Sequence, residues 1–341
     1  FVGIDVGTGS ARAGVFDAAG NLLATAKRPI DIHRADGGIV EQSSEQIWQA
    51  VCQSVAEAVG TSGVDAGQIK GVGFDATCSL VVRGPDGPLP VGDHPDRDII
   101  VWMDHRALEQ AGRINRGQHD VLRYVGGRIS PEMETPKLLW LKENRPETFN
   151  TAEHFFDLTD FLTWKASGAT KRSACTVTCK WTYLAHEGRW DADYFRRIGL
   201  EELADEDFTR IGQTVVDPGT ALGNGLTDEA ADAMGLRAGT AVAAGLIDAH
   251  AGGIGTVGAS GGAGDPTRAM AYVFGTSSCT MTTTRDPAFV PGVWGPYYSA
   301  MVPGMWLNEG GQSAAGAAID QLVRLHPHSS EAEASAKQDR K

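Results

Sequence analysis

The sequence has few cysteines and no long apolar run, and these two absences exclude several classes of protein. The chain has 341 residues and only five cysteines, an odd number scattered through apolar surroundings. Cys175 and Cys179 form the only close pair, and no set of His or Cys completes a metal site. We expect all five to be reduced and buried, which favours a cytoplasmic protein. No apolar run approaches the roughly 18 residues of a membrane span, so none is expected.

Basic residues are outnumbered by acidic ones. Lys and Arg number 30 against 43 Asp and Glu, for a net charge of −13. This balance argues against nucleic acid and anionic membranes as partners. A nucleotide would be held by Mg²⁺ and local N–H groups rather than by an overall positive field. The length suits two domains, and a hydrophobic content of 42% is enough for their cores.

The first sixteen residues predict a strand, a glycine turn and a second strand. The turn Gly7-Thr8-Gly9-Ser10 can expose several backbone N–H groups, which together form an anion site. Asp5, at the end of the first strand, can hold a metal ion or its water. The turn joins two strands, whereas the dinucleotide fingerprint and the Walker loop each open a helix, so both of these are disfavoured.

A similar pattern recurs late in the chain. Residues 269–274 read as a strand, Gly275-Thr276-Ser277-Ser278 as a turn, and residues 279–284 as a second strand. Two such hairpins suggest two similarly built domains that face one polyphosphate. This is the organisation of the actin, hexokinase and heat-shock ATPase superfamily.

Between the hairpins, the residue pattern indicates further elements around one carboxylate. A strand of small residues at 240–245 leads to Asp248, which lies among residues too small to hide it. The other expected elements are a helix capped by Ser43 and Gln46, strands at 69–75 and 98–102, a helix after Asp104 that Asp104 can cap, and a helix beginning at Thr135-Pro136.

With these motifs in view, the sequence resembles the FGGY carbohydrate kinases, and within them the pentulose kinases related to D-ribulokinase. The matching motifs span nearly the whole chain in order: Asp5–Arg12, Gly73–Val82, Trp102–Ala107, Pro136–Asn144, Cys179–Tyr183, Ile247–Gly253, Gly275–Cys279 and Asn308–Ser313.

The resemblance implies an α/β fold of the actin-like ATPase (ribonuclease H-like) type, with two similar domains around a central cleft. We expect residues 1–258 to form the first domain and residues 259–341 to begin the second. Family members are longer and carry a late Gly-Gly motif against adenosine, which nothing after Gln312 supplies. We therefore expect the second domain to be incomplete in this chain, and we make no prediction for the adenine pocket.

The resemblance also assigns roles to individual residues. It makes Asp248 the catalytic base, and Asp5 and Asp248 the carboxylates linked to the metal, through water rather than directly. The expected nucleotide contacts are Gly7, Thr8, Gly9, Ser10, Arg12, Gly275, Thr276, Ser277, Gly311 and Gln312. The expected sugar contacts are Ala76, Trp102, Asp104, Arg106, Lys180, Asp248 and Glu309.

Simpler roles stay open for some of these residues. Lys180 could be a solvated surface lysine, Glu309 a charge near a helix, and Asp104 only a helix cap. His250, beside the expected base, is interpreted as a structural histidine rather than an acid catalyst.

The implied activity is ATP-dependent, Mg²⁺-dependent phosphorylation of a ketopentose, D-ribulose first, on its C5 hydroxyl. Domain closure would exclude water, with a hinge near residues 257–266. L-ribulose, D-xylulose, ribitol and glycerol remain alternative substrates. Two other classes also remain: an actin-type or heat-shock-type ATPase, and a catalytically inactive sugar sensor. The expected partners are a small sugar and ATP, without nucleic acid or membrane, and a homodimer is left open.

Overall fold

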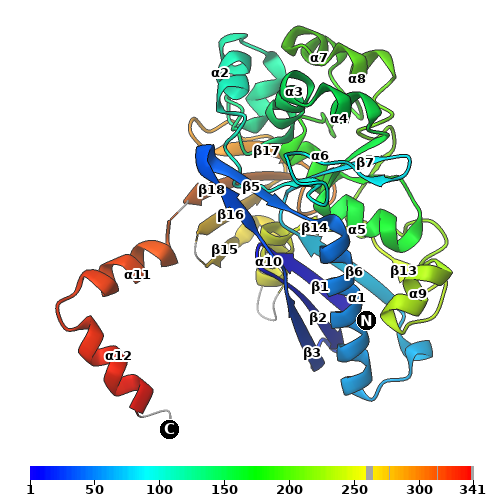
Figure 1. Cartoon of the computed structure of the whole chain (residues 1–341), viewed down its shortest axis with the longest axis vertical. Coiled ribbons are helices and arrows are strands. Elements are labelled where there is room, and N and C mark those ends of the chain that lie inside the picture. The colour runs from blue at the N-terminus through cyan, green and yellow to red at the C-terminus, as the bar shows by residue number, and fades with distance from the viewer. Residues whose placement is uncertain (259–263, 276, 313, 339–341) are drawn as a thin grey trace.

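The structure, a computed structural model, describes residues 1–258, 264–275, 277–312 and 314–338. Its body contains three larger β-sheets, with a group of helices gathered at one end, and two C-terminal helices extend away from it (Figure 1). The part of the expected hinge at residues 259–263 lies outside the described residues. No helix in the described ranges is both long and apolar enough to cross a bilayer.

The first sheet is built on the predicted N-terminal hairpin. Strands β1 (Val2–Gly7) and β2 (Ser10–Phe16) pair antiparallel, and β3 (Leu22–Pro29) continues the meander. On the other side of β1, β6 (Gly71–Ala76) runs parallel to it. Two short strands then pair in parallel with β6: β13 (Ala241–Val242) and β14 (Leu246–Ile247).

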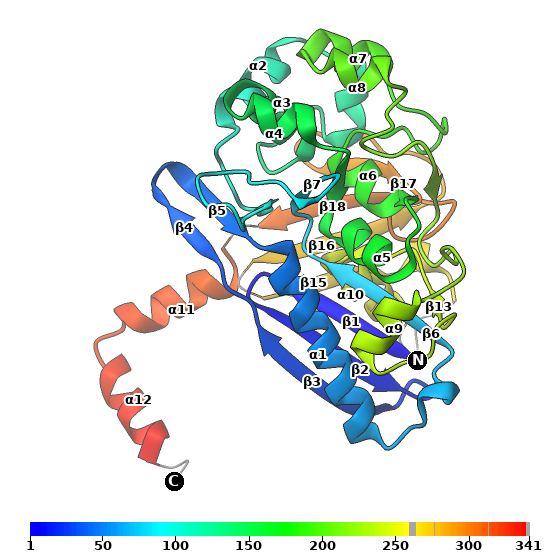
Figure 2. The same ribbon diagram turned by 45° about the vertical axis from the view of Figure 1, so that its right-hand side comes forward.

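Helix α1 (Ser44–Ser62) covers this sheet across β2 and β3 (Figure 2). Its start confirms the predicted cap, because the Ser43 hydroxyl accepts the N–H of Gln46 at 3.4 Å. It ends at Gly63, whose φ of 69° is left-handed and favours glycine. The buried face of α1 includes Ile47, Val51 and Val55, which join the apolar side chains of the sheet in one core.

The second sheet and a group of helices form the other end of the body. The strands are β4 (His33–Ala35), β5 (Ile39–Gln42), β7 (Leu80–Gly84), β8 (Gly87–Pro88), β9 (Ile99–Ile100) and β10 (His154–Asp157). The helices there are α2 (Leu108–Arg116), α3 (Glu134–Asn144), α4 (Pro146–Thr151), α6 (Ala174–Lys180), α7 (Ala192–Ile198) and α8 (Glu201–Asp205). Helices α5 (Leu158–Ser167) and α9 (Asp228–Met234) belong instead to the core of the first sheet.

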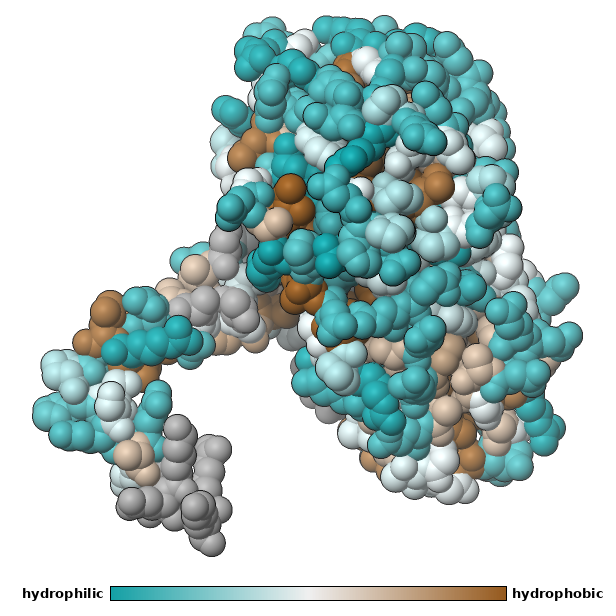
Figure 3. All heavy atoms as spheres, in the orientation of Figure 1, coloured by the Kyte–Doolittle hydropathy of each residue, from teal (hydrophilic) through white to brown (hydrophobic). Residues whose placement is uncertain are grey.

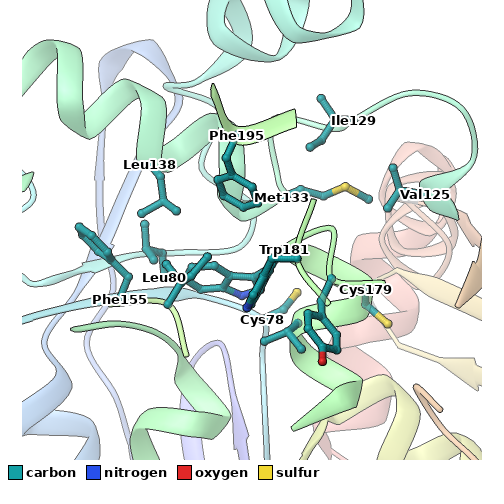
Figure 4. Packing of buried hydrophobic residues seen from close by; sticks show 14 of the residues in the cluster. Cys78, Leu80, Val125, Ile129, Met133, Leu138, Phe155, Cys179, Trp181 and Phe195 are labelled. Atoms are coloured by element: carbon teal, nitrogen blue, oxygen red, sulfur yellow. The ribbon is translucent and has the colours of Figure 1, made fainter. Parts of the chain in front are cut away.

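A second apolar core lies between the helices of this group and the second sheet. Figure 4 shows Leu138, Met133 and Phe195 gathered around the indole of Trp181, which is 1% exposed. A short parallel ladder joins β11 (Arg172–Ser173) and β12 (Val215–Val216) beside this core. The core fixes α6, which carries Lys180 at its last turn.

One local prediction in this region is confirmed at a shorter length and another was wrong. The strand expected at 98–102 is present as β9 and pairs at Ile99–Ile100. Helix α3 begins at Glu134, so Thr135 lies in its first turn and does not cap it. The Thr135 hydroxyl forms a hydrogen bond with the hydroxyl of the buried Tyr194 at 2.9 Å instead of with the start of the helix.

The second predicted hairpin is confirmed and forms the edge of the third sheet. Its strands β15 (Met270–Phe274) and β16 (Ser278–Thr284) pair antiparallel, and β18 (Trp306–Gln312) and β17 (Trp294–Tyr298) follow in the order β15-β16-β18-β17. Helix α10 (Asp248–Val257) packs between β15 and the first sheet. A Cβ on Gly253 would lie 2.6 Å from the Met301 sulfur, so a larger residue there would require the Met301 side chain to shift.

Helices α11 (Gly316–Leu325) and α12 (Ser329–Gln338) follow the third sheet. They point away from the body, and the brown spheres on α11 in Figure 3 show apolar side chains on its surface. Ile319 and Leu322 are 53% and 68% exposed.

Candidate active site

Three carboxylates lie close together where neighbouring strands of the first sheet end. Asp5 pairs with Asp75 in the parallel register of β1 and β6, and Leu246 of β14 pairs with Asp75 from the other side. Asp248 follows β14 directly and opens α10. All three residues are half-buried. Open α/β sheets bind ligands at the carboxyl ends of their parallel strands. The place where these three carboxylates lie is therefore the candidate active site.

The three carboxylates do not have equal acidity. Burial, followed by the charges of Asp5 and Asp248, raises the pKa of Asp75 to about 8, while Arg12 opposes the shift. Burial also raises the pKa of Asp248, and the charge of Asp5 adds to it. The Ala249 N–H donates to Asp248 Oδ1 at 2.7 Å and stabilises the ionised form. Asp75 therefore holds its proton near neutral pH, and Asp248 is a stronger base than an exposed aspartate.

Asp5 forms an ion pair across the first hairpin. Arg12 lies opposite it in the register of β1 and β2, and its guanidinium donates to Asp5 Oδ2 at 2.6 Å. Within the described ranges, no three His, Cys, Asp or Glu side chains are grouped closely enough to hold a metal ion alone. Mg²⁺ typically takes one or two protein carboxylates, with water and substrate phosphate as its other ligands. Asp5 and Asp248 fit that donor set.

The first turn carries the predicted nucleotide contacts Gly7 to Ser10. A Cβ placed on Gly9 would have no atom within 4 Å, so the turn is open at that point. The Thr8 hydroxyl accepts the indole N–H of Trp102 at 3.1 Å, and the Thr8 carbonyl accepts the amide of Gln42 at 2.8 Å. Ser10 is buried at the start of β2. Trp102, a predicted sugar contact, is thereby tied to the first glycine turn.

The second turn lies beside the end of β18. The N–H of Gly275 donates to the Ser277 carbonyl at 2.8 Å, whereas Thr276 lies outside the described residues. In the β16–β18 ladder, Gln312 pairs with Ser278 and Gly311 pairs with Cys279. The structure therefore brings Gly275, Ser277, Gly311 and Gln312 to one end of the third sheet, where Gly311 and Gln312 are exposed.

Lys180 and Glu309 are buried, at 7% and 9% exposure, so the solvated alternative for Lys180 is wrong. The Lys180 ammonium lies 5.0 Å from the ring centre of Trp294, which is opposite Glu309 in the β17–β18 register. Burial alone would raise the pKa of Glu309. His250, through its hydrogen bond and charge, and then Lys180 outweigh burial and lower it to about 2. Glu309 is therefore a buried, ionised carboxylate on a strand.

Asp104 and Arg106 form a buried cross-link. Asp104 is fully buried and accepts the Val40 N–H at 2.6 Å, and it also pairs with Arg106 at 2.8 Å. Arg106 reaches Glu41 at 2.9 Å. The predicted cap on α2 is wrong: its N-cap residue is Ala107 without a side-chain bond, because Asp104 accepts the backbone N–H of Arg106 instead. Sugar contacts by Asp104 and Arg106 stay predictions, as does that of Ala76, which is buried at the end of β6.

Two features escaped the sequence reasoning. Asp75 was not selected, although Val2-Gly3-Ile4-Asp5 and Val72-Gly73-Phe74-Asp75 share one pattern, and this repeat was the available signal. The second feature is a line of hydrogen-bonded side chains made of Cys175, His250, Glu309 and Cys279. Residues so far apart in sequence gave no signal of this line. Cys279 is half-buried, so the expectation that all five cysteines are buried was wrong for this one.

Replacing Asp75 with asparagine is expected to remove a pH dependence of stability. The pKa of Asp75 is raised from 3.8 to about 8 on folding, so between these values the folded chain holds a proton that the unfolded chain releases. The free energy of unfolding then falls as pH rises through this window, by an amount on the order of a few kcal/mol, and the neutral amide escapes the loss. Thermal unfolding from about pH 5 to about pH 8 should show the variant gaining on the wild type as pH rises.

The matched control for this measurement is Asp86→Asn in an exposed turn, whose melting curve should follow the wild type at every pH. Parallel melting curves for Asp75→Asn and the wild type would show that Asp75 is ionised in the folded protein.

Comparison with known families matches both parts of the chain. Residues 1–255 match the N-terminal domain of the FGGY family of carbohydrate kinases, and residues 270–341 match its C-terminal domain. The chain is 54% identical to an FGGY carbohydrate kinase domain-containing protein of Homo sapiens, over 96% of this chain and 61% of that protein. It is 40% identical to a D-ribulokinase of Saccharomyces cerevisiae, over 96% of this chain and 50% of that protein.

Comparison with solved structures gives the same fold. The crystal structure of xylulose kinase from Rhodospirillum rubrum superposes with a TM-score of 0.81 at 22% identity, covering 99% of this chain and 65% of that one. The chain thus spans about 61% of the human relative and 50% of the yeast relative.

Proposed function

The chain belongs to the FGGY family of carbohydrate kinases, and on this premise we propose that it transfers the γ-phosphoryl group of ATP to a ketopentose, D-ribulose first, at the terminal C5 hydroxyl. The observation that carries the proposal is Asp248, a half-buried carboxylate of raised pKa at the junction of a parallel strand and a helix. The 40% identity to the yeast D-ribulokinase supports the choice of sugar.

Phosphoryl transfer depends on positioning and charge stabilisation more than on covalent catalysis. The backbone N–H groups of the two glycine turns would bind the phosphates, and Arg12 would add a positive charge beside the first turn. Asp5 and Asp248 would hold Mg²⁺ largely through its waters. When bound, the metal would neutralise phosphate charge.

Asp248 would act as the general base. It would accept the proton of the sugar hydroxyl as the oxygen attacks phosphorus. Its raised pKa brings it closer to the operating pH than an ordinary aspartate. Asp75 beside it would remain protonated and would add no second negative charge next to the incoming phosphate.

Lys180, Glu309 and Trp102 would select the sugar. Lys180 offers a buried donor and Glu309 a buried acceptor, and both are suited to hydroxyl groups. An ATP-driven switch protein of the actin or heat-shock type would share the two phosphate turns. It would not require the buried pair of Lys180 and Glu309, because it binds no sugar. The pair therefore favours the sugar kinase over that alternative.

A substrate screen tests the proposal. ADP release by the whole protein would be measured with D-ribulose, L-ribulose, D-xylulose, ribitol and glycerol. D-ribulose is expected to give the highest kcat/KM, because a site built to hydrogen-bond particular hydroxyl groups discriminates strongly against wrong geometry. A screen in which glycerol or D-xylulose wins would reassign the substrate. ATP hydrolysis that no sugar stimulates would favour the switch-protein alternative.

A further inference from the structure

A continuous line of buried side chains reaches Glu309 from the first part of the chain. The Cys175 sulfur lies 3.1 Å from Nδ1 of His250, and Nε2 of the same ring lies 3.2 Å from Glu309 Oε2. Cys279 donates to the other oxygen, Oε1, at 3.1 Å. His250 has no exposed surface. Both oxygens of Glu309 are therefore held by side chains from other elements.

The proton between His250 and Glu309 can be assigned from the partners. An ionised carboxylate only accepts hydrogen bonds, so Nε2 of His250 must carry a proton and donate a hydrogen bond to Glu309. Nδ1, on the other side of the ring, faces the Cys175 sulfur, which also receives the Ile247 N–H at 3.4 Å. The contact with Cys175 therefore holds the imidazole from the side opposite Glu309.

The four side chains come from four elements on both sides of the site. Cys175 is on α6 and His250 on α10, while Cys279 and Glu309 are on the neighbouring strands β16 and β18. His250 lies two residues after Asp248 on the same helix. The line therefore connects the helix that presents the proposed base to the strand that presents the proposed sugar acceptor.

We propose that His250, held in place by Cys175, is a positioning residue that orients the Glu309 carboxylate toward the sugar hydroxyl groups. This role concerns the sugar site of the proposed function and rests on that function. An ionised carboxylate has about four acceptor positions. Cys279 and His250 occupy one on each oxygen, which leaves the remaining lone pairs in fixed directions for a sugar. Without His250, Glu309 would keep its charge near Lys180 but lose its fixed orientation.

Two nearly isosteric variants separate the two ends of the imidazole. In His250→Gln the side-chain amide reaches the place of Nε2 and keeps a donor for Glu309. In His250→Asn the amide lies near the place of Nδ1, so Cys175 keeps a partner and Glu309 loses one. Both variants remove the ring, so they serve as controls for each other.

Steady-state kinetics of the whole protein, with the sugar that the screen selects, would measure the difference. His250→Asn is expected to raise KM for the sugar by about tenfold or more, the effect of losing a hydrogen bond to a charged group. His250→Gln should stay within about threefold of the wild type, an effect below that of one such bond. KM for ATP should change in neither. Equal sugar KM values in the two variants, or an ATP KM that rises with the sugar KM, would overturn the inference.

A spectroscopic measurement on the wild type covers the case in which a variant does not fold. In protein labelled with ¹⁵N-histidine, the Nε2–H of His250 should exchange slowly with solvent, because the residue is fully buried. Its signal should shift when the sugar is added and not when ADP alone is added. A signal that the sugar leaves unchanged would overturn the inference.

The wild type also separates this inference from the proposed function. A wild type that phosphorylates no sugar, and whose histidine signal no sugar shifts, would overturn both. An active wild type with two equivalent variants would overturn the positioning role alone.

Discussion

Replacing Asp248 with asparagine is expected to lower kcat by about 10²–10⁴-fold, the contribution that a general base typically makes. Asparagine keeps the size of the side chain and can still accept the Ala249 N–H through its carbonyl, but it cannot take the proton of the sugar hydroxyl. The two glycine turns that we propose to bind phosphate are untouched, so nucleotide affinity should change little. Folding should also survive, because the substitution is nearly isosteric.

The measurement is steady-state turnover with D-ribulose, together with nucleotide binding and thermal unfolding. Asp86→Asn is the matched control, since it makes the same chemical change in an exposed turn. A kcat retained within about threefold, far below the general-base range, would remove Asp248 from the role of base. A variant that does not fold would assign Asp248 a structural role instead.

Replacing Lys180 with methionine is expected to lower kcat/KM for the sugar by about 10–100-fold. Lys180 is buried, and the described residues offer its ammonium the ring of Trp294 and the charge of Glu309. A sugar hydroxyl that accepts from this ammonium would gain a charge-assisted hydrogen bond of about 1.5–3 kcal/mol, and each 1.4 kcal/mol corresponds to about tenfold. Methionine keeps much of the apolar stem and loses the donor together with its charge.

Lys70→Met is the control, because Lys70 is exposed and precedes the first residue of β6, whereas Asp75 lies near the last. It should leave both KM values unchanged. An unchanged kcat/KM for the sugar in Lys180→Met would contradict the sugar-binding role, and an equal loss for ATP would relocate Lys180 to nucleotide binding.

The parts of the fold that the sequence predicted are those in which local chemistry and tertiary packing agree. The two glycine hairpins and the Ser43 cap needed only neighbouring residues, and the structure has them where the pattern placed them. Asp104 and Thr135 have the residue types of helix caps. In the structure each side chain forms a hydrogen bond with a residue from a distant segment and does not cap its helix. Local sequence carries no information about such partners.

The same limit applied to the candidate site. Asp248 was recognisable because small residues surround it. The burial of Lys180 and the contact between His250 and Glu309 depend on how α6, α10 and β18 pack, and no spacing predicts that. Asp75 was predictable from the repeated Val-Gly-x-Asp pattern, but only if two similar strands were assumed to lie side by side in register.

The parallel pairing of β14 with β6 also determines when the first sheet can be completed during synthesis of the chain. Asp5 and Asp75 emerge early, but β13 and β14, which cover the other edge of β6, lie beyond residue 240. At a translation rate of 5–20 residues per second, roughly 8–35 s separate the emergence of β6 from that of β14. Throughout that interval β6 presents an unpaired edge, which is a template for wrong pairing. The nascent chain is therefore expected to need chaperone protection at β6 until β14, the strand that precedes Asp248, closes the sheet.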